Sequence, residues 1–371
     1  MTYIHQLKDW PAFTWDTASV AAQLGGVRLR QGRLLGRASA LGLAFQDEAM
    51  LSSLTEEAIK TSEIEGEALD ADQVRSSVAR HLGLDVGGTV RADRHVDGLV
   101  EMMMDATQNY GAPLTAARLH AWQGALFPTG RSGLKRIRTA AWRTPDADPM
   151  QVISGAAGRE RVHFEAPAAD KLSDEMKAFL AWYNTAARPA NMDGVLKAAL
   201  AHLWFVTIHP FEDGNGRIAR AITDMTLARS EDSGQRFYSM SAQIRAEGNG
   251  YYEILERTQK GGLDITPWML WFLECLDRAF TRAEDVLGAV IEKARFWERH
   301  ATEPFNERQR HMLMRLLEGF EGKLTSSKWA KLAKCSQDTA GRDIDALVRR
   351  GILERSAAGG RSVSYALRGT T

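Results

Sequence analysis

This sequence has only two cysteines, no long apolar run and no surplus of one charge, and each of these features excludes a class of protein. The two cysteines, Cys275 and Cys335, lack the close spacing of a metal site and favour a reducing compartment. No run of about 18 uncharged apolar residues occurs, so we expect no membrane-spanning helix and no membrane partner. Lys+Arg and Asp+Glu both number 47, which argues against a nucleic-acid coat or an acidic tail. We therefore expect a globular, cytoplasmic protein.

Helical periodicity dominates what is present. Apolar residues recur at spacings of three and four over residues 47–83, 174–185 and 195–209, which predicts core helices. Between residues 146 and 167, two short β-prone runs flank a Gly-rich turn, the pattern of a lone hairpin. The predicted fold class is mainly α, with one β-hairpin on a helical body.

The last segment, residues 305–371, differs from the rest in charge and in the order of its predicted elements. It holds 13 Lys/Arg against 7 Asp/Glu. Three predicted helices precede two short strands around Gly359 and Gly360, which is the order of a winged helix-turn-helix. Its exposed residues would be Thr339, Arg342, Arg349 and Arg361. We expect this module to bind DNA or a protein partner, and the sequence leaves both open.

The stretch HPFEDGNGRIAR, residues 209–220, carries the strongest functional signal. Gly214, Asn215 and Gly216 tolerate positive φ and close backbone approach, so their N–H groups can converge on an anion. The helix that begins near Arg217 adds the positive end of its dipole to the same point. The sequence therefore predicts a phosphate-binding nest.

Charged side chains around the nest specify the ligand further. Arg217 and Arg220 lie one helical turn apart, and each guanidinium can bind phosphate oxygens in a fork, which predicts a di- or triphosphate. Asp213 would repel that anion unless a divalent cation lay between them. A carboxylate together with phosphate oxygens is the usual Mg²⁺ environment, so we expect Mg²⁺ at Asp213.

His209 and Phe211 flank the turn that Pro210 imposes at the end of the preceding helix. An imidazole at this place can take a proton from a hydroxyl that attacks phosphorus. The Phe211 ring is expected to enter the core and to fix the loop.

These residues resemble the signature of the Fic family, His-x-Phe-x-Asp/Glu-Gly-Asn-Gly-Arg-x-x-Arg, and match it at every fixed position. The resemblance implies a helical core with a β-hairpin flap, and transfer of AMP from ATP to a side-chain hydroxyl of a target protein. It also implies roles for individual residues: His209 as the base, Asp213 as the Mg²⁺ ligand, Gly214, Asn215, Gly216 and Arg217 as phosphate ligands, and Arg220 as the ligand of the terminal phosphate. Glu212 falls on the variable position of the signature.

The resemblance extends beyond the loop. The hairpin at 148–167 looks like the family's flap, which aligns a target segment by strand addition. Tyr251 and Tyr252 would line the adenine pocket, although paired aromatic residues are also common in cores. The opening residues resemble the N-terminal helical domain of a subset of bacterial Fic proteins. We predict domains at 1–100, 101–300 and 305–371.

A second motif lies at Thr61–Gly66, where the order Thr-x-x-x-Glu-Gly resembles the inhibitory motif of Fic proteins. In that regulatory class the glutamate, here Glu65, pairs with the second arginine, here Arg220. The carboxylate would take the donor that the γ-phosphate needs, so the chain would inhibit itself. On composition alone the segment would be a solvated helix end. Glu63 and Glu67 are expected to matter much less than Glu65.

The leading hypothesis is therefore a protein adenylyltransferase that acts on a Tyr, Ser or Thr hydroxyl of a target protein or of the chain itself. Transfer of another nucleotide, a phosphate or phosphocholine, or removal of AMP from a modified protein, would fit the same site. A nucleotide-sensing DNA-binding regulator is the alternative from another class, and it would not need His209. The sequence leaves the target and the choice between monomer and homodimer open.

Overall fold

The computed structural model describes most of the chain, which divides into two compact units. Unit one is Met1–Asp285 and unit two is Val286–Thr371. The described residues are 2–85, 90–145, 149–154, 161–185, 192–317, 320, 322–355 and 363–368. Most of them lie in α-helices, which confirms the predicted fold class.

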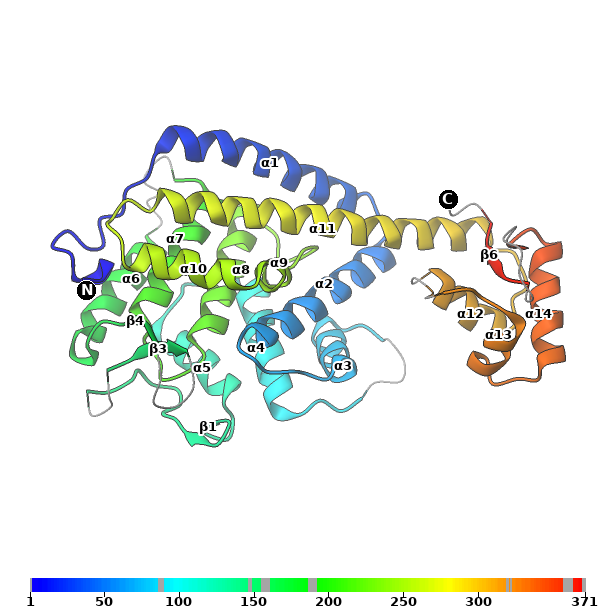
Figure 1. Cartoon of the computed structure of the whole chain (residues 1–371), viewed down its shortest axis with the longest axis horizontal. Helices are drawn as coiled ribbons and strands as arrows, with labels where there is room; N and C mark the ends of the chain where they lie inside the picture. Colours follow the sequence, from blue (N-terminus) through cyan, green and yellow to red (C-terminus); the bar gives the residue numbers. More distant parts are fainter. Residues whose placement is uncertain are drawn as a thin grey trace. The chain divides into compact units, whose positions relative to one another are not determined.

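The first helices of unit one form its N-terminal part. They are α1 (Thr17–Ser39), α2 (Leu43–Ile64), α3 (Ala71–Leu82) and α4 (Arg94–Gln108). Helices α2, α3 and α4 pack on one another in chain order. Helix α1 lies beside the first part of α11 (Thr266–Arg299), where Arg30 binds Asp277 at 2.7 Å (Figure 1). The predicted domain boundary at residue 100 falls inside α4 and stays a prediction.

The centre of unit one is the pair α7 and α8. The remaining helices of this part are α5 (Ala116–Leu126), α6 (Leu172–Asn184), α7 (Gly194–Ile208), α8 (Asn215–Glu231), α9 (Met240–Glu247) and α10 (Asn249–Gln259). Helix α7 is buried from Val195 to Ile208 apart from the partly buried Lys197, as expected for a helix that is apolar on nearly every face. The motif loop connects α7 to α8, so its two ends are held by the best-packed elements of the unit.

Short antiparallel strands complete unit one. They are β1 (Arg131–Ser132), β2 (Lys135–Arg136), β3 (Gln151–Ser154) and β4 (Arg161–Glu165). Strand β3 pairs with β4, which confirms the predicted hairpin; its tip, 155–160, lies outside the described residues. Phe164 points into the core and is 1% exposed, whereas Ile153 and Val162 are exposed on the hairpin. Phe164 thus anchors the hairpin to the core.

Unit two has a core of its own, which includes Met312, Trp329, Ile344 and Leu347. Its elements are α12 (Glu307–Leu317), α13 (Ser326–Leu332), α14 (Gln337–Arg349), β5 (Leu353–Arg355) and β6 (Tyr365–Leu367). Strands β5 and β6 are antiparallel, so the predicted order of three helices and two strands is present.

The assignment of unit two as a winged helix-turn-helix stays a prediction. Arg342 and Arg349 are exposed on α14, and Thr339 on the same helix is partly buried. Arg361 and the Gly359–Gly360 turn lie outside the described residues.

Two expectations concern the whole described chain. None of the helices described combines the length and the apolar character needed to cross a membrane. Cys275 and Cys335 are both free, Cys275 in the core and Cys335 partly buried.

The end of α2 is fixed to α9 by a buried carboxylate. Glu57 is 4% exposed and accepts hydrogen bonds from the Ser239 hydroxyl at 2.7 Å and from the Ser241 N–H at 3.0 Å. The Ser241 hydroxyl donates to the same carboxylate. Because Ser241 lies in the first turn of α9, the negative charge also stabilises that helix terminus. Glu57 therefore positions the last two turns of α2.

Replacement of this carboxylate should destabilise unit one. Glu57→Ala leaves buried donors of Ser239 and Ser241 without partners, and we expect it to lower the free energy of unfolding by about 3 kcal/mol. Glu56→Ala is the matched control, because Glu56 binds the half-exposed Arg282 at 2.6 Å and should contribute less than about 1 kcal/mol. Urea unfolding followed by circular dichroism measures both. Equal effects of the two substitutions would show that Glu57 is no anchor.

Candidate active site

His209 ends α7 in a left-handed backbone conformation, with φ 51° and ψ 59°. Its Nδ1 atom lies 3.2 Å from the carbonyl oxygen of Val206. Since a carbonyl only accepts hydrogen bonds, Nδ1 carries the proton and Nε2 keeps its lone pair in the neutral ring. Burial lowers the pKa of His209 below its ordinary value, so the ring is neutral at pH 7. This geometry suits a general base that acts through Nε2.

Arg143 holds the backbone of this turn, which the sequence did not reveal. Its Nε donates to the carbonyl of His209 at 2.9 Å, and its backbone N–H donates to the carbonyl of Pro210 at 3.0 Å. The side chain is 6% exposed, and burial lowers the pKa of Arg143 to about 10, still far above neutrality. The Arg143 cation therefore holds the backbone of His209 in its left-handed conformation.

The loop itself is clamped at both ends. Phe211 is fully buried against Trp142, with ring centroids 4.7 Å apart, which confirms its predicted place in the core. The Asn215 side chain accepts from the Phe211 N–H at 3.0 Å and donates to the Phe211 carbonyl at 2.8 Å. The Asn215 side chain therefore stabilises the loop. Only its backbone N–H is available to bind an anion in the predicted nest.

Two glycines are required by close contacts. Gly214 has φ 88°, and a Cβ atom there would lie 2.9 Å from the Phe127 ring. A Cβ on Gly216 would lie 2.2 Å from Oε1 of Glu65. A carboxylate oxygen thus stands against the first turn of α8, which is where the helix dipole favours an anion.

Both motif arginines are buried beside this point and keep unused donors. Arg217 is 7% exposed and Arg220 is 3% exposed. Among the described residues, neither Nε of Arg217 nor Nη1 of Arg220 has a hydrogen-bond partner. Buried donors without partners are uncommon in folded proteins. These two fit the oxygen atoms of a phosphate chain.

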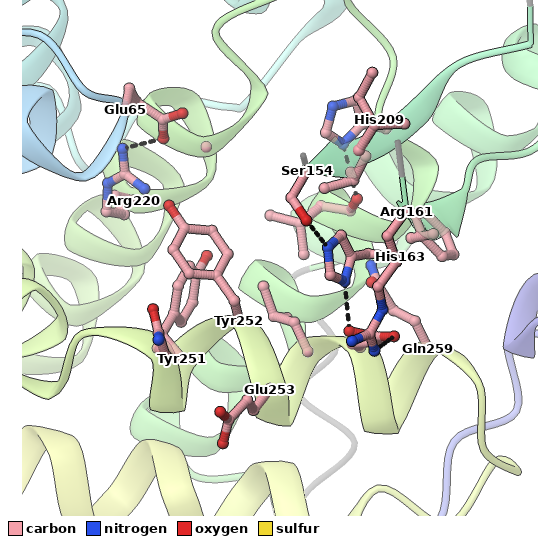
Figure 2. A pocket seen from close by; sticks show the side chains of 18 residues that line it. Glu65, Ser154, Arg161, His163, His209, Arg220, Tyr251, Tyr252, Glu253 and Gln259 are labelled. Atoms are coloured by element: carbon pink, nitrogen blue, oxygen red, sulfur yellow. Dashed lines mark hydrogen bonds and ion pairs between the residues drawn. The ribbon is translucent and has the colours of Figure 1, made fainter. Parts of the chain in front are cut away.

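The predicted contact between Glu65 and Arg220 is present. Oε1 of Glu65 lies 2.7 Å from Nη2 of Arg220 (Figure 2). Thr61 of the same segment accepts from Arg220 twice, at its hydroxyl at 2.6 Å and at its carbonyl at 2.9 Å. Burial alone would lower the pKa of Arg220, but the carboxylate of Glu65 raises it above its ordinary value. The sequence pattern included Thr61 without giving it this role.

Asp213 is the candidate Mg²⁺ ligand. Its Oδ1 accepts from the Gly214 N–H at 2.6 Å, and its Oδ2 accepts from the Ser132 hydroxyl. The described residues contain no group of three or more His, Cys, Asp or Glu side chains suited to a metal. A single carboxylate is compatible with Mg²⁺ that takes its other ligands from phosphates and water. The donor set therefore fits a cation that arrives with the nucleotide.

Two cavities meet at the motif loop, and Glu65 lines both. The first cavity, about 710 Å³, is bounded by the motif loop, the hairpin and α10, with His209, Arg220 and Tyr252 among its lining residues (Figure 2). The second cavity, about 800 Å³, is lined by Glu67, Asp213 and Arg217 among others. The first has the size of a small-molecule site.

Tyr251 and Tyr252 both line the first cavity, and their hydroxyl groups are engaged within the protein. Their place in an adenine pocket stays a prediction. Tyr252 is 48% exposed and donates to the carbonyl of Ile64 at 3.0 Å. Tyr251 is buried, with its hydroxyl 2.8 Å from Nε2 of His202. Tyr252 therefore ties α10 to the end of α2, and Tyr251 ties it to α7.

His202 belongs to a chain of hydrogen bonds with a defined direction. The Thr223 hydroxyl donates to the Ala219 carbonyl at 2.8 Å, so it accepts from Nδ1 of His202 at 2.9 Å. Nε2 of His202 must then accept from the Tyr251 hydroxyl. Burial, with a smaller contribution from the charge of Arg220, lowers the pKa of His202 to about 3. His202 is a neutral structural residue.

The hairpin is joined to α10 by a polar cluster that the sequence did not reveal. Glu256 accepts from Nδ1 of His163 at 2.6 Å and from Arg161 at 3.0 Å. The other nitrogen of His163 lies 2.6 Å from the Ser154 hydroxyl (Figure 2). A hydrogen bond from Lys260, followed by those from His163 and Arg161, lowers the pKa of Glu256 to about 2. This cluster closes the first cavity on the side opposite Arg220.

Comparison with known proteins agrees with the motif. Residues 113–227 match the Fic/DOC family, and residues 3–84 match a family described as a domain of unknown function, DUF4172. A protein adenylyltransferase Fic from Drosophila ananassae is 26% identical over 270 residues, which are 71% of this chain and 48% of that protein. A protein of the same name from Culex quinquefasciatus is 35% identical over 112 residues, 30% of this chain and 21% of that protein.

A solved structure covers nearly the whole chain. The crystal structure of a Fic family protein from Desulfovibrio desulfuricans G20 has a TM-score of 0.55 at 19% identity, over 97% of this chain and 99% of that chain. This likeness shows the fold. The chain spans less than half the length of the two curated relatives. The family match shows that residues 113–227 form a domain of the Fic/DOC family.

The low pKa of His202 leads to a prediction about how the stability of the chain depends on pH. The pKa of His202 is about 3 in the folded chain and near 6.5 when unfolded, so between these values only the unfolded chain binds the proton. The contribution of the neutral His202 to the free energy of unfolding is therefore fully present above pH 6.5 and is lost as the pH falls toward 3. Between pH 7 and pH 5, the wild type should lose about 2 kcal/mol more unfolding free energy than His202→Gln. Identical pH dependence of both proteins in urea unfolding would refute this.

Proposed function

We propose that the chain is a protein adenylyltransferase that moves AMP from MgATP to a Tyr, Ser or Thr hydroxyl of a target protein. The observation that carries the proposal is the pairing of a neutral His209, whose Nε2 is free to accept a proton, with two buried arginines that keep unused donors. The curated relatives are named protein adenylyltransferases, which supports the same reaction.

In the proposed reaction, every bond and proton is accounted for by the nucleotide, the acceptor hydroxyl and His209. The acceptor hydroxyl loses its proton to Nε2 of His209, and its oxygen forms a bond to the α-phosphorus of ATP. The bond from that phosphorus to the oxygen bridging the α- and β-phosphates breaks, and pyrophosphate leaves with the electron pair. Bound Mg²⁺ would neutralise phosphate charge beside Asp213. The nest and Arg217 hold the phosphates in line, so positioning and charge account for most of the acceleration.

The hairpin is the proposed docking element for the target. Ile153 is 55% exposed and Val162 is 38% exposed, and both lie on strands that border the first cavity. An extended target segment that adds to the hairpin would bring its hydroxyl toward His209. Unit two is proposed to bind DNA or a second protein partner. The acceptor also includes hydroxyl groups of the chain itself.

Glu65 is proposed to keep this site inactive. Its carboxylate uses one donor of Arg220 and stands against Gly216, where a phosphate oxygen would otherwise lie. Transfer of another nucleotide or of a phosphate, or removal of AMP, remains the alternative chemistry for the same residues. Nucleotide sensing without transfer is less favoured, since it gives no reason to fix the Nδ1 proton of His209.

Labelled nucleotides test the reaction class. A host lysate incubated with the Glu65→Gly chain and ATP labelled at the α-phosphate should yield a new labelled protein band, whereas γ-labelled ATP should yield no band beyond those that the lysate's own kinases label without the chain. His209→Ala in the same background should abolish the label while MgATP binding stays within about threefold, because the nest and arginines remain. Label from the γ-position would indicate phosphate transfer. Label from another base in preference to adenine would indicate a different nucleotide.

Release of Arg220 should activate the chain. Glu65→Gly is expected to raise transfer by at least about tenfold, which corresponds to roughly 1.4 kcal/mol of transition-state binding. The gain should disappear when Arg220→Ala is added, because the freed arginine is what binds the phosphate. Glu63→Gly is the control, since Glu63 binds Lys60 at 2.8 Å and Arg245 at 3.5 Å, outside the motif loop. Equal transfer by wild type and Glu65→Gly over several ATP concentrations contradicts self-inhibition.

A further inference from the structure

The end of α2 presents two carboxylates from one turn. Gly66 has φ 79°, and its N–H donates to the Glu63 carbonyl at 3.1 Å. The N–H of Glu67 donates to the Ser62 carbonyl at 3.0 Å. This pair of hydrogen bonds is the Schellman motif, which needs a residue with positive φ at its centre. Glu65 and Glu67 therefore lie on either side of a chain reversal with a fixed geometry.

Each carboxylate binds a different arginine of the motif. Glu65 binds Arg220 at 2.7 Å, and Oε2 of Glu67 lies 2.9 Å from Nη1 of Arg217. The Arg217 guanidinium also lies over the Phe127 ring, 5.0 Å from its centroid. Since residues 217 and 220 are one turn apart on α8, the reversal at Gly66 matches the two carboxylates to both arginines.

The helix dipoles favour the same arrangement. Negative side chains are unfavourable at a helix C-terminus, and the last turn of α2 contains no basic residue. The first turn of α8, which includes Arg217, supplies the opposite partial charge and a cation. The two carboxylates thus occupy a position whose electrostatics would otherwise attract phosphate.

We propose that Glu67 is a second regulatory residue, which occupies Arg217 as Glu65 occupies Arg220. This inference rests on the proposed function, in which Arg217 binds the inner phosphates and Arg220 the terminal one. Glu67 lines the second cavity together with Arg217 and Asp213, so it competes with the phosphates nearest the Mg²⁺ ligand. Glu65 → Gly alone then leaves one of the two arginines occupied.

The two carboxylates act on different parts of the nucleotide, which separates their effects. ADP has no γ-phosphate, so it does not require Arg220, but it does require Arg217. Neutralisation of Glu67 should therefore tighten MgADP. The Glu67 side chain is 39% exposed and is screened by water, so the expected gain is modest, about threefold.

Calorimetric titration of MgADP into full-length chains tests the inference. Glu67→Gln should tighten MgADP by at least about threefold relative to wild type, and should raise AMP transfer by a similar factor when added to Glu65→Gly. Glu63→Gln is the matched control, because it removes the same charge from the same segment without touching a motif arginine, and it should change neither quantity.

The outcomes separate the inference from the function on which it rests. Unchanged or weaker MgADP binding by Glu67→Gln, or an equal gain from Glu63→Gln, overturns the role of Glu67. Failure of every variant to bind MgADP or MgATP overturns the proposed function instead. Thermal unfolding of each variant in the absence of nucleotide identifies a gain or loss that comes only from changed folding.

Discussion

The ion pair between Glu65 and Arg220 is the contact on which the arrangement of the site depends. Arg220 is 3% exposed, and a buried cation without a counter-charge is costly. Either a carboxylate from α2 or an oxygen of a bound phosphate can supply that charge. Under the proposed function both cannot occupy the same place beside Gly216, so the chain would carry its own competitor for the phosphate. The rest of the molecule sets how well this competitor is placed.

Several contacts fix the position of the Glu65 carboxylate. Glu57 fixes α2 on α9, Tyr252 ties α10 to the carbonyl of Ile64, and Asn215 braces the loop on the other side. These contacts come from helices, which hold side chains more rigidly than free loops do. At Gly66 itself, a Cβ atom would meet nothing within 4 Å, so the reversal point is open on that side.

Local patterns in the sequence predicted much of the site. The motif loop, the hairpin and the buried Phe211 follow from residues close in sequence, whereas the Glu65–Arg220 contact was expected only from the resemblance to the Fic inhibitory motif. The contacts that the sequence did not predict join residues far apart in the chain: Glu67 is 150 residues from Arg217, and Arg143 is 66 residues from His209. Such pairs leave no periodicity or spacing in a single sequence. The Glu256 cluster also depends on how the hairpin packs, which composition does not specify.

The discrimination between tri- and diphosphate tests the assignment of Glu65 most directly. A non-hydrolysable ATP analogue and ADP, each with Mg²⁺, should be titrated into wild type and Glu65→Gly by calorimetry. If Glu65 occupies the place of the terminal phosphate, the substitution should tighten the analogue by at least about tenfold and leave ADP within about twofold. An equal gain for both nucleotides, or no gain for the analogue, would contradict that assignment.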